Sequence, residues 1–146
     1  MTPTKVMLVD DEKPFVEAVS KRLDKRGCKI IAAYSGEEAM TKLNSKEGAN
    51  VDVVLLDVKM PGMDGNDTLK AIKQAHPLIE VIMLTGHGTM ESAIEGMRQG
   101  AFDYMTKPAE MDILAAKIEQ ASSKKRGHEA KIQEARAQMI VTRRGD

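Results

Sequence analysis

The feature that most constrains the fold of this chain is the stretch of residues 52–65, which reads DVVLLDVKMPGMDG. Its apolar run, residues 53–56, is unbroken and closed by turn residues, a pattern that favours a strand buried on both faces. The carboxylate of Asp57 follows this run directly, and a proline and a glycine then interrupt regular structure. Because ligands bind at the carboxyl ends of strands in open α/β sheets, Asp57 is predicted to lie at a functional edge.

Short apolar runs alternate with helical segments along most of the chain. The predicted strands are residues 5–9, 28–33, 51–57, 81–84 and 101–105. Apolar residues at helical spacing follow each strand; Phe15 lies in the first such stripe, Thr89 can cap the fourth helix, and Ser35 and Glu38 have the spacing of a capping box. Five alternations predict an α/β fold, a doubly wound five-stranded parallel sheet with helices on both faces.

The composition excludes several classes of protein. The 22 basic and 22 acidic residues cancel, which argues against a general nucleic-acid-binding surface. A single cysteine, Cys28, allows neither an internal disulfide nor a CxxC metal site. No apolar stretch at the start is long enough for a signal peptide or a membrane span, so we expect a soluble, cytoplasmic protein with no membrane partner.

Polar side chains close four of the five predicted strands. Asp10 and Asp11 follow the first strand, Asp57 the third, Thr85 the fourth and Lys107 the fifth. In a parallel sheet these groups share one edge, where three carboxylates repel one another unless a cation is present. Hard oxygen ligands of this kind suit Mg²⁺. A lysine and a hydroxyl beside the metal suit a phosphoryl group, and an aspartate can itself be the nucleophile that accepts it.

Together these residues resemble the receiver domain of two-component response regulators, over residues from about 4 to 121. Residues 57–65 (DVKMPGMDG) are similar to the phosphoacceptor stretch of that family, and residues 100–108 (GAFDYMTKP) are similar to its last strand. The resemblance implies a flavodoxin-like strand order of 2-1-3-4-5.

The resemblance also implies a chemical role for the acidic residues. Asp57 resembles the phosphoacceptor, which takes a phosphoryl group from a phosphohistidine on a sensor histidine kinase or a phosphotransfer protein. Asp10 and Asp11 resemble the acidic pair that holds Mg²⁺, and the backbone carbonyl of Lys59 matches the third protein ligand beside Asp57. The implied protein is a signalling switch, which catalyses only its own phosphorylation and dephosphorylation.

The remaining implied positions belong to the switch. Lys107 would pair with the phosphoryl oxygens, and Thr85 would bind another oxygen and move together with Tyr104. Lys59 and His87 occupy positions that tune dephosphorylation in the family. The readout face would be the fourth helix, fifth strand and fifth helix, which would bind a downstream protein or a second copy. The chain would be either a single-domain regulator or the amino-terminal piece of a longer one.

Two other classes of function stay open. The first is an aspartate-nucleophile phosphatase. That family has the pattern Asp-x-Asp at its nucleophile, whereas Lys59 takes the place of the second aspartate here. The second is an interaction module in which the acidic edge is only structural. Turnover of a phosphoester substrate would favour the phosphatase. Normal partner binding after Asp57→Asn, with no response to a phosphodonor, would favour the interaction module.

Residues 122–146 form a basic tail in the predicted organisation, after a receiver domain of residues 4–121. The tail holds seven basic and three acidic residues, or a net charge of +4. Apolar residues at coiled-coil spacing run from Met111 to Met139, so one alternative is a fifth helix that continues and pairs with a partner. The other alternative is a helix that ends near Ser122, followed by a disordered segment.

Overall fold

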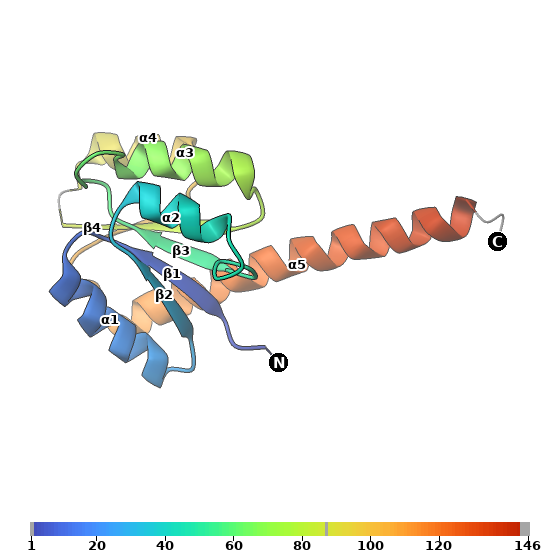
Figure 1. The fold of residues 1–146 in the computed structure, drawn as a ribbon, viewed down its shortest axis with the longest axis horizontal. Helices are drawn as coiled ribbons and strands as arrows, with labels where there is room; N and C mark the ends of the chain where they lie inside the picture. Colours follow the sequence, from blue (N-terminus) through green and yellow to red (C-terminus); the bar gives the residue numbers. More distant parts are fainter. Residues whose placement is uncertain (1, 87, 144–146) are drawn as a thin grey trace.

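The computed structural model describes residues 2–86 and 88–143, with side chains up to residue 141. Parallel strands form one sheet in the order β2-β1-β3-β4-β5, which confirms the predicted doubly wound sheet and its flavodoxin-like order (Figure 1). The strands are β1 (Lys5–Val9), β2 (Lys29–Ala33), β3 (Val53–Leu56), β4 (Glu80–Thr85) and β5 (Asp103–Thr106). Strand β5 begins and ends slightly later in the chain than the predicted strand at residues 101–105.

Helices cover both faces of this sheet. Their bounds are α1 (Lys13–Lys25), α2 (Gly36–Leu43), α3 (Gly65–Ala75), α4 (Met90–Arg98) and α5 (Met111–Arg143). The apolar faces of α1 and α5 share one buried cluster with the sheet, whereas those of α2 and α3 share the other. Figure 1 shows α4 on the same side as α2 and α3.

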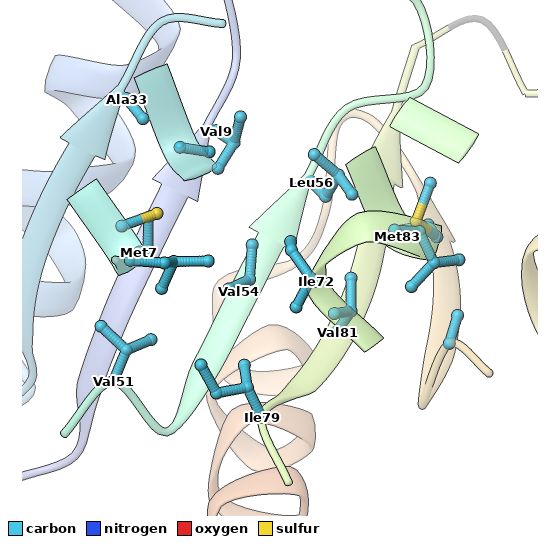
Figure 2. Packing of buried hydrophobic residues seen from close by; sticks show 14 of the residues in the cluster. Met7, Val9, Ala33, Val51, Val54, Leu56, Ile72, Ile79, Val81 and Met83 are labelled. Carbon is cyan, nitrogen blue, oxygen red and sulfur yellow. The ribbon is translucent and has the colours of Figure 1, made fainter. Parts of the chain in front are cut away.

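Strand β3 is buried on both faces, as predicted from its unbroken apolar run. Val54 and Leu56 lie in the cluster beneath α2 and α3, which Figure 2 shows from close by. Val53 and Leu55 point to the opposite side and lie in the cluster beneath α1 and α5. Because alternate residues face opposite layers, both faces must be apolar, and the strand ends where the chain reaches the polar edge.

Side-chain caps begin α2, α3 and α4, and the Glu110 carboxylate accepts from first-turn amides of α5. The Ser35 hydroxyl accepts from the Glu38 amide, and Thr89 and Ser92 form a reciprocal capping box at α4. The predicted box at Ser35 is wrong in its second half, because the Glu38 carboxylate accepts from the Tyr34 amide, one residue before the cap. At α3, Asp64 is the cap, and its carboxylate accepts from the Asp67 amide.

The described part of the tail is helical, because α5 continues through it without a break. This helix continues from Met111 through Gly127 to Arg143, and at about 1.5 Å per residue it spans about 50 Å. Its carboxyl half projects beyond the sheet (Figure 1), where Ile132 and Met139 are 39% and 56% exposed. None of the helices in the described part of the chain combines the length and the apolar composition of a membrane span. The division at residue 121 stays a prediction.

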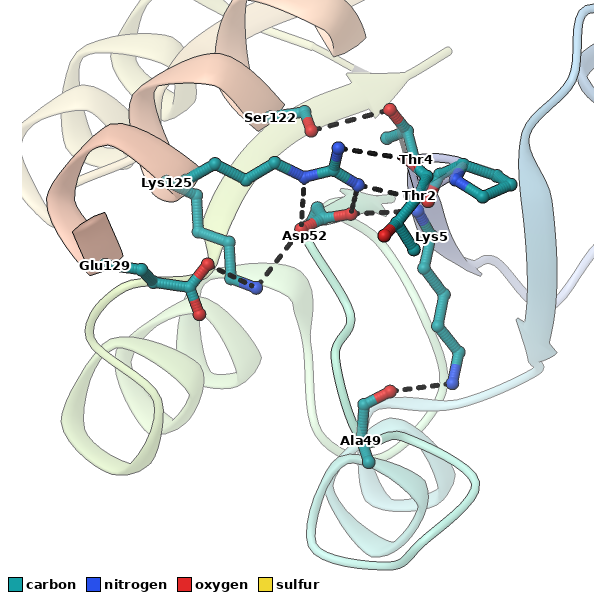
Figure 3. Close-up of polar contacts among 10 residues, drawn as sticks. Thr2, Thr4, Lys5, Ala49, Asp52, Ser122, Lys125 and Glu129 are labelled. Carbon is teal, nitrogen blue, oxygen red and sulfur yellow. Dashed lines mark hydrogen bonds and ion pairs between the residues drawn. The ribbon is translucent and has the colours of Figure 1, made fainter. Parts of the chain in front are cut away.

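A buried carboxylate, Asp52, anchors α5 at the amino end of β3. Its oxygens accept from the Lys5 amide at 3.0 Å, from Lys125 Nζ at 3.1 Å and from Arg126 Nη2 at 3.0 Å (Figure 3). Burial raises the pKa of Asp52, but the hydrogen bonds from Arg126, Lys5 and Lys125 outweigh it, so this pKa lies below its usual value. The contacts dock α5 beyond residue 121.

A second buried carboxylate, Glu80, lies beside this anchor at the start of β4. Its oxygens lie 3.5 Å from Lys73 Nζ and 3.4 Å from Lys124 Nζ, and its amide donates to the Asp52 carbonyl. Lys124, Lys125 and Arg126 are therefore held by carboxylates from two central strands. Each buried carboxylate at this amino edge of the sheet therefore has two cationic partners.

Candidate functional site

Three carboxylates converge at the opposite, carboxyl edge of the sheet. One oxygen from each of Asp10, Asp11 and Asp57 lies within 4.8 Å of the others. Asp10 and Asp57 are 1% and 2% exposed, whereas Asp11 is exposed. The pairing of β1 with β3 brings them together, since the Asp57 amide donates to the Val9 carbonyl. The sheet therefore assembles the acidic group that the sequence predicted.

Lys107 enters this acidic group from the loop after β5. Its amide donates to the Thr85 carbonyl, which places the residue at the end of β4. Its Nζ atom lies 2.5 Å from Asp10 Oδ2, 3.9 Å from Asp57 Oδ2 and 3.8 Å from Glu12 Oε1. One lysine therefore faces several carboxylates, and the cluster keeps an excess of negative charge.

The environment of Asp57 favours its neutral form. Burial raises the pKa of Asp57 above its usual value, and the negative charge of Asp10 raises it further. The Thr85 hydroxyl, Lys107 and the Val58 amide oppose this effect without cancelling it. A carboxyl with a raised pKa at the end of a central strand is a group that lacks part of its compensating charge.

The residues present fit a divalent cation of the Mg²⁺ type. They offer hard oxygen ligands from Asp10, Asp11 and Asp57 at mutual distances that one ion can bridge. Burial and the negative charge of Asp10 raise the pKa of Asp57, and a cation bound at these oxygens would lower it. Lys59 lies in the loop after β3 with an exposed side chain, and its carbonyl stays a prediction as a ligand.

Tyr104 connects β5 to the start of α4. Its hydroxyl lies 3.0 Å from Ser92 Oγ, within the capping box of that helix. A Cβ atom at Gly88 would lie 2.4 Å from the Tyr104 hydroxyl, so the loop accommodates the ring only with glycine there. Thr85, at the end of the neighbouring strand, is fully buried. His87, one of the predicted tuning positions, lies outside the described residues.

Phe15 is a site residue that the sequence did not reveal. It was assigned to the apolar stripe of the first helix, and it does pack against the core beneath α1 and α5. Its ring, however, also faces Lys107, with Nζ 4.0 Å from the ring centroid. Helical spacing cannot distinguish a ring at the core boundary from one inside the core. The only sequence signal that Phe15 lies near the site is the run of acidic residues shortly before it.

The chain resembles known regulators over most of its described length. It is 39% identical to the DNA-binding transcriptional regulator NtrC of Salmonella typhimurium over 118 residues, 81% of this chain and 24% of that protein. It is also 39% identical to the transcriptional regulatory protein CpxR of Escherichia coli, over 78% of this chain and 47% of that protein. The chain thus spans about a quarter to a half of the length of these relatives.

Solved structures agree with this. A response regulator receiver domain protein from Clostridium thermocellum superposes with a TM-score of 0.79 and 34% identity, over 84% of this chain and 97% of that one. A BeF3-activated DrrB receiver domain gives a TM-score of 0.72 and 32% identity, over 82% and 97% of the two chains. Residues 6–119 match the family model of the response regulator receiver domain. The sheet order is thus that of a known family, and the chain belongs to the response regulator receiver domains of two-component systems.

Proposed function

We propose that Asp57 accepts a phosphoryl group from a phosphohistidine on a sensor histidine kinase or a phosphotransfer protein, in a reaction that depends on Mg²⁺. The observation that carries this proposal is the pairing of a buried Asp57 of raised pKa with two further carboxylates and one lysine. A structural carboxylate would be fully compensated. Here three carboxylates face a single lysine, which favours the binding of a positive ion.

The transfer forms a bond between an Asp57 carboxylate oxygen and phosphorus as the P–N bond of the phosphohistidine breaks. The electron pair of that bond stays on the histidine nitrogen, and the imidazole leaves neutral because its ring takes up one proton from solvent. A bound Mg²⁺ would be held by Asp10, Asp11, Asp57 and the Lys59 carbonyl, and it would supply charge neutralisation for the phosphoryl oxygens. Lys107 orients the incoming group, and its charge balances the charge that the group brings.

The proposed switch uses the residues beside the site. The Thr85 hydroxyl opposes the raised pKa of Asp57, so it is close enough to bind a phosphoryl oxygen there. Phosphorylation would bias an existing equilibrium in which Thr85 and Tyr104 move together. The bond of Tyr104 to Ser92 supports the link to α4.

The proposed readout surface consists of α4, β5 and α5. On α4, Met90, Ile94 and Met97 are exposed, and Ile113 of α5 is exposed as well. Exposed apolar side chains of this kind mark protein interaction sites. We propose that this surface binds a downstream protein or a second copy, in the cytoplasm, and that the chain itself does not bind nucleic acid. The chain catalyses only its own phosphorylation and dephosphorylation.

Incubation with Mg²⁺ and acetyl phosphate, followed by intact-mass measurement, tests the proposal. We expect one phosphoryl adduct that is absent from Asp57→Asn and from a sample treated with a chelator. Asp67→Asn, which changes an exposed aspartate of α3, serves as the matched control and should keep the adduct. An adduct that survives Asp57→Asn would contradict the assigned acceptor. Sustained turnover of a small phosphoester would favour the phosphatase alternative.

A further inference from the structure

The ring of Phe15 provides Lys107 with an uncharged partner inside an acidic site. The ring lies in the first turn of α1 and packs against the apolar cluster beneath α1 and α5. Neighbouring core side chains therefore fix its position. The Lys107 ammonium lies 4.0 Å from the ring centroid, well within the range of a cation–π contact.

Two of the three carboxylate partners of Lys107 would also bind a metal, and the third, Glu12 at 3.8 Å, has a side chain that is 57% exposed. Asp10 contacts the ammonium at 2.5 Å and Asp57 lies at 3.9 Å, and both belong to the metal-binding group. When a divalent cation binds there, these carboxylates give part of their attraction to it. The ring is not an oxygen ligand, so Mg²⁺ does not compete for it.

The chemistry of lysine makes such a partner useful. Its ammonium ends a flexible four-carbon stem, and it takes many positions unless something holds it. The Lys107 side chain is only 12% exposed, and a cation–π contact is stronger where water is excluded. The ring can therefore keep the ammonium in the cleft after Asp10 has turned to the metal.

We propose that Phe15 is a positioning residue for phosphoryl transfer: it holds Lys107 against its ring while Asp10 and Asp57 bind Mg²⁺, which leaves the ammonium ready to pair with the phosphoryl oxygens. This inference rests on the proposed function. It assigns to an apolar residue of α1 a role that Asp10 and Asp57 cannot fill, because both are drawn to the metal. The remaining charged neighbour, Glu12, is 57% exposed, and an ion pair with so exposed a carboxylate is weak.

Four variants test the inference. Phe15→Leu and Phe15→Met remove the ring and keep an apolar side chain. Phe15→Tyr keeps a ring face. Phe102→Leu is the matched control, because Phe102 belongs to the same apolar cluster and its ring faces Lys124, 5.6 Å away. Thermal unfolding first establishes that each variant is folded.

Calorimetric titration then separates metal binding from phosphoryl binding. We expect all four variants to bind Mg²⁺ with affinities within about twofold of the unchanged chain. In saturating Mg²⁺, Phe15→Leu and Phe15→Met should bind beryllofluoride, a phosphoryl analogue, about 2- to 30-fold more weakly, in line with the strength of a cation–π contact. Their phosphorylation by acetyl phosphate should slow by a similar factor. Phe15→Tyr and Phe102→Leu should match the unchanged chain.

Two results would overturn the inference. One is unchanged beryllofluoride affinity in both apolar variants while the unchanged chain binds it. The other is a parallel loss of Mg²⁺ and beryllofluoride binding that Phe15→Tyr does not rescue, which would mean that Phe15 only supports the shape of the site. If the unchanged chain binds no beryllofluoride and takes no phosphoryl group, the proposed function fails as well, and this result is distinct from the first two.

Discussion

Asp52 and Asp57 flank the same short strand, β3, and both are almost fully buried, at 3% and 2% exposed. Their surroundings are opposite. At the amino edge, Asp52 is bonded to Lys125, Arg126 and the Lys5 amide, and its pKa is lowered. At the carboxyl edge, Asp57 shares a single lysine with other carboxylates, and its pKa is raised.

The exposed fraction of a side chain alone does not distinguish a structural aspartate from a functional one. Two buried aspartates look equal by exposure, yet only one has its charge compensated within the protein. Compensation within the fold serves stability, because each oxygen already has its partners. A buried charge that is only partly compensated destabilises the fold. Such charges are found where a bound ligand supplies the missing compensation. The carboxyl edge of β3 is therefore the functional end of the strand.

The largest expected effect is at the amino edge. Asp52→Asn leaves the buried Lys125 with only the part-exposed carboxylate of Glu129, and removal of one member of a buried pair costs about 3 kcal/mol or more. Urea denaturation should show a free energy of unfolding lower by that amount. Asp24→Asn, an exposed aspartate of α1, should change it by less than about 0.5 kcal/mol. A loss as small as that of the control would mean that the amino edge is not an anchor.

Mg²⁺ should stabilise the chain through the carboxyl edge alone. At a concentration of about 100 times its dissociation constant, the gain is about 2.7 kcal/mol, because the ion binds the folded state. We expect Asp52→Asn to keep this gain, although it starts from lower stability, and Asp10→Asn to lose most of it. Thermal unfolding with and without Mg²⁺ measures both. An equal gain in the two variants would place the ion elsewhere.

Asp57→Asn should act in the opposite direction to Asp52→Asn. Without metal at neutral pH it removes an under-compensated charge, so the free energy of unfolding should rise, by about 0.5–2 kcal/mol, as is common when a functional site is relaxed. The same substitution at the two ends of one strand then gives opposite signs. A destabilised Asp57→Asn would show that the charge at the carboxyl edge is compensated after all.

The pH dependence should separate the two ends. A raised pKa means that folded Asp57 binds more protons than the unfolded chain, so its contribution to stability falls as pH rises from the usual aspartate value through the raised one. A lowered pKa means that the contribution of Asp52 is present above the usual value and is lost as pH falls through the lowered one. The free energies of unfolding of Asp52→Asn and Asp57→Asn should therefore approach that of the unchanged chain in acid. Denaturation at a series of pH values checks this.

The smallest effect is expected for an exposed member of the amino edge. Lys124 contacts Glu80 with a side chain that is 48% exposed, and exposed ion pairs contribute about 0–1 kcal/mol. Lys124→Gln should therefore cost less than Lys125→Gln, whose side chain is 8% exposed. Equal costs would mean that burial does not set the strength of the anchor.

Most of the fold and the acidic edge could be predicted from the sequence. The run before Asp57 reports a doubly buried strand, and parallel strands bring their carboxyl ends to one edge. The docking of α5 could not be predicted, because Lys125 and Arg126 look like solvated charges and their partner Asp52 lies 73 and 74 residues away. The ring of Phe15 was missed because an apolar stripe does not reveal which member faces a charge.

The most direct test of this account is a titration of the aspartate side chains by carbon-detected NMR, with and without Mg²⁺. The account predicts that the pKa of Asp57 lies above its usual value in the metal-free chain and falls when Mg²⁺ is added. It predicts that the pKa of Asp52 lies below its usual value in both conditions. An Asp57 that titrates at or below the usual value without metal, or an Asp52 that responds to Mg²⁺ as Asp57 does, would contradict the account.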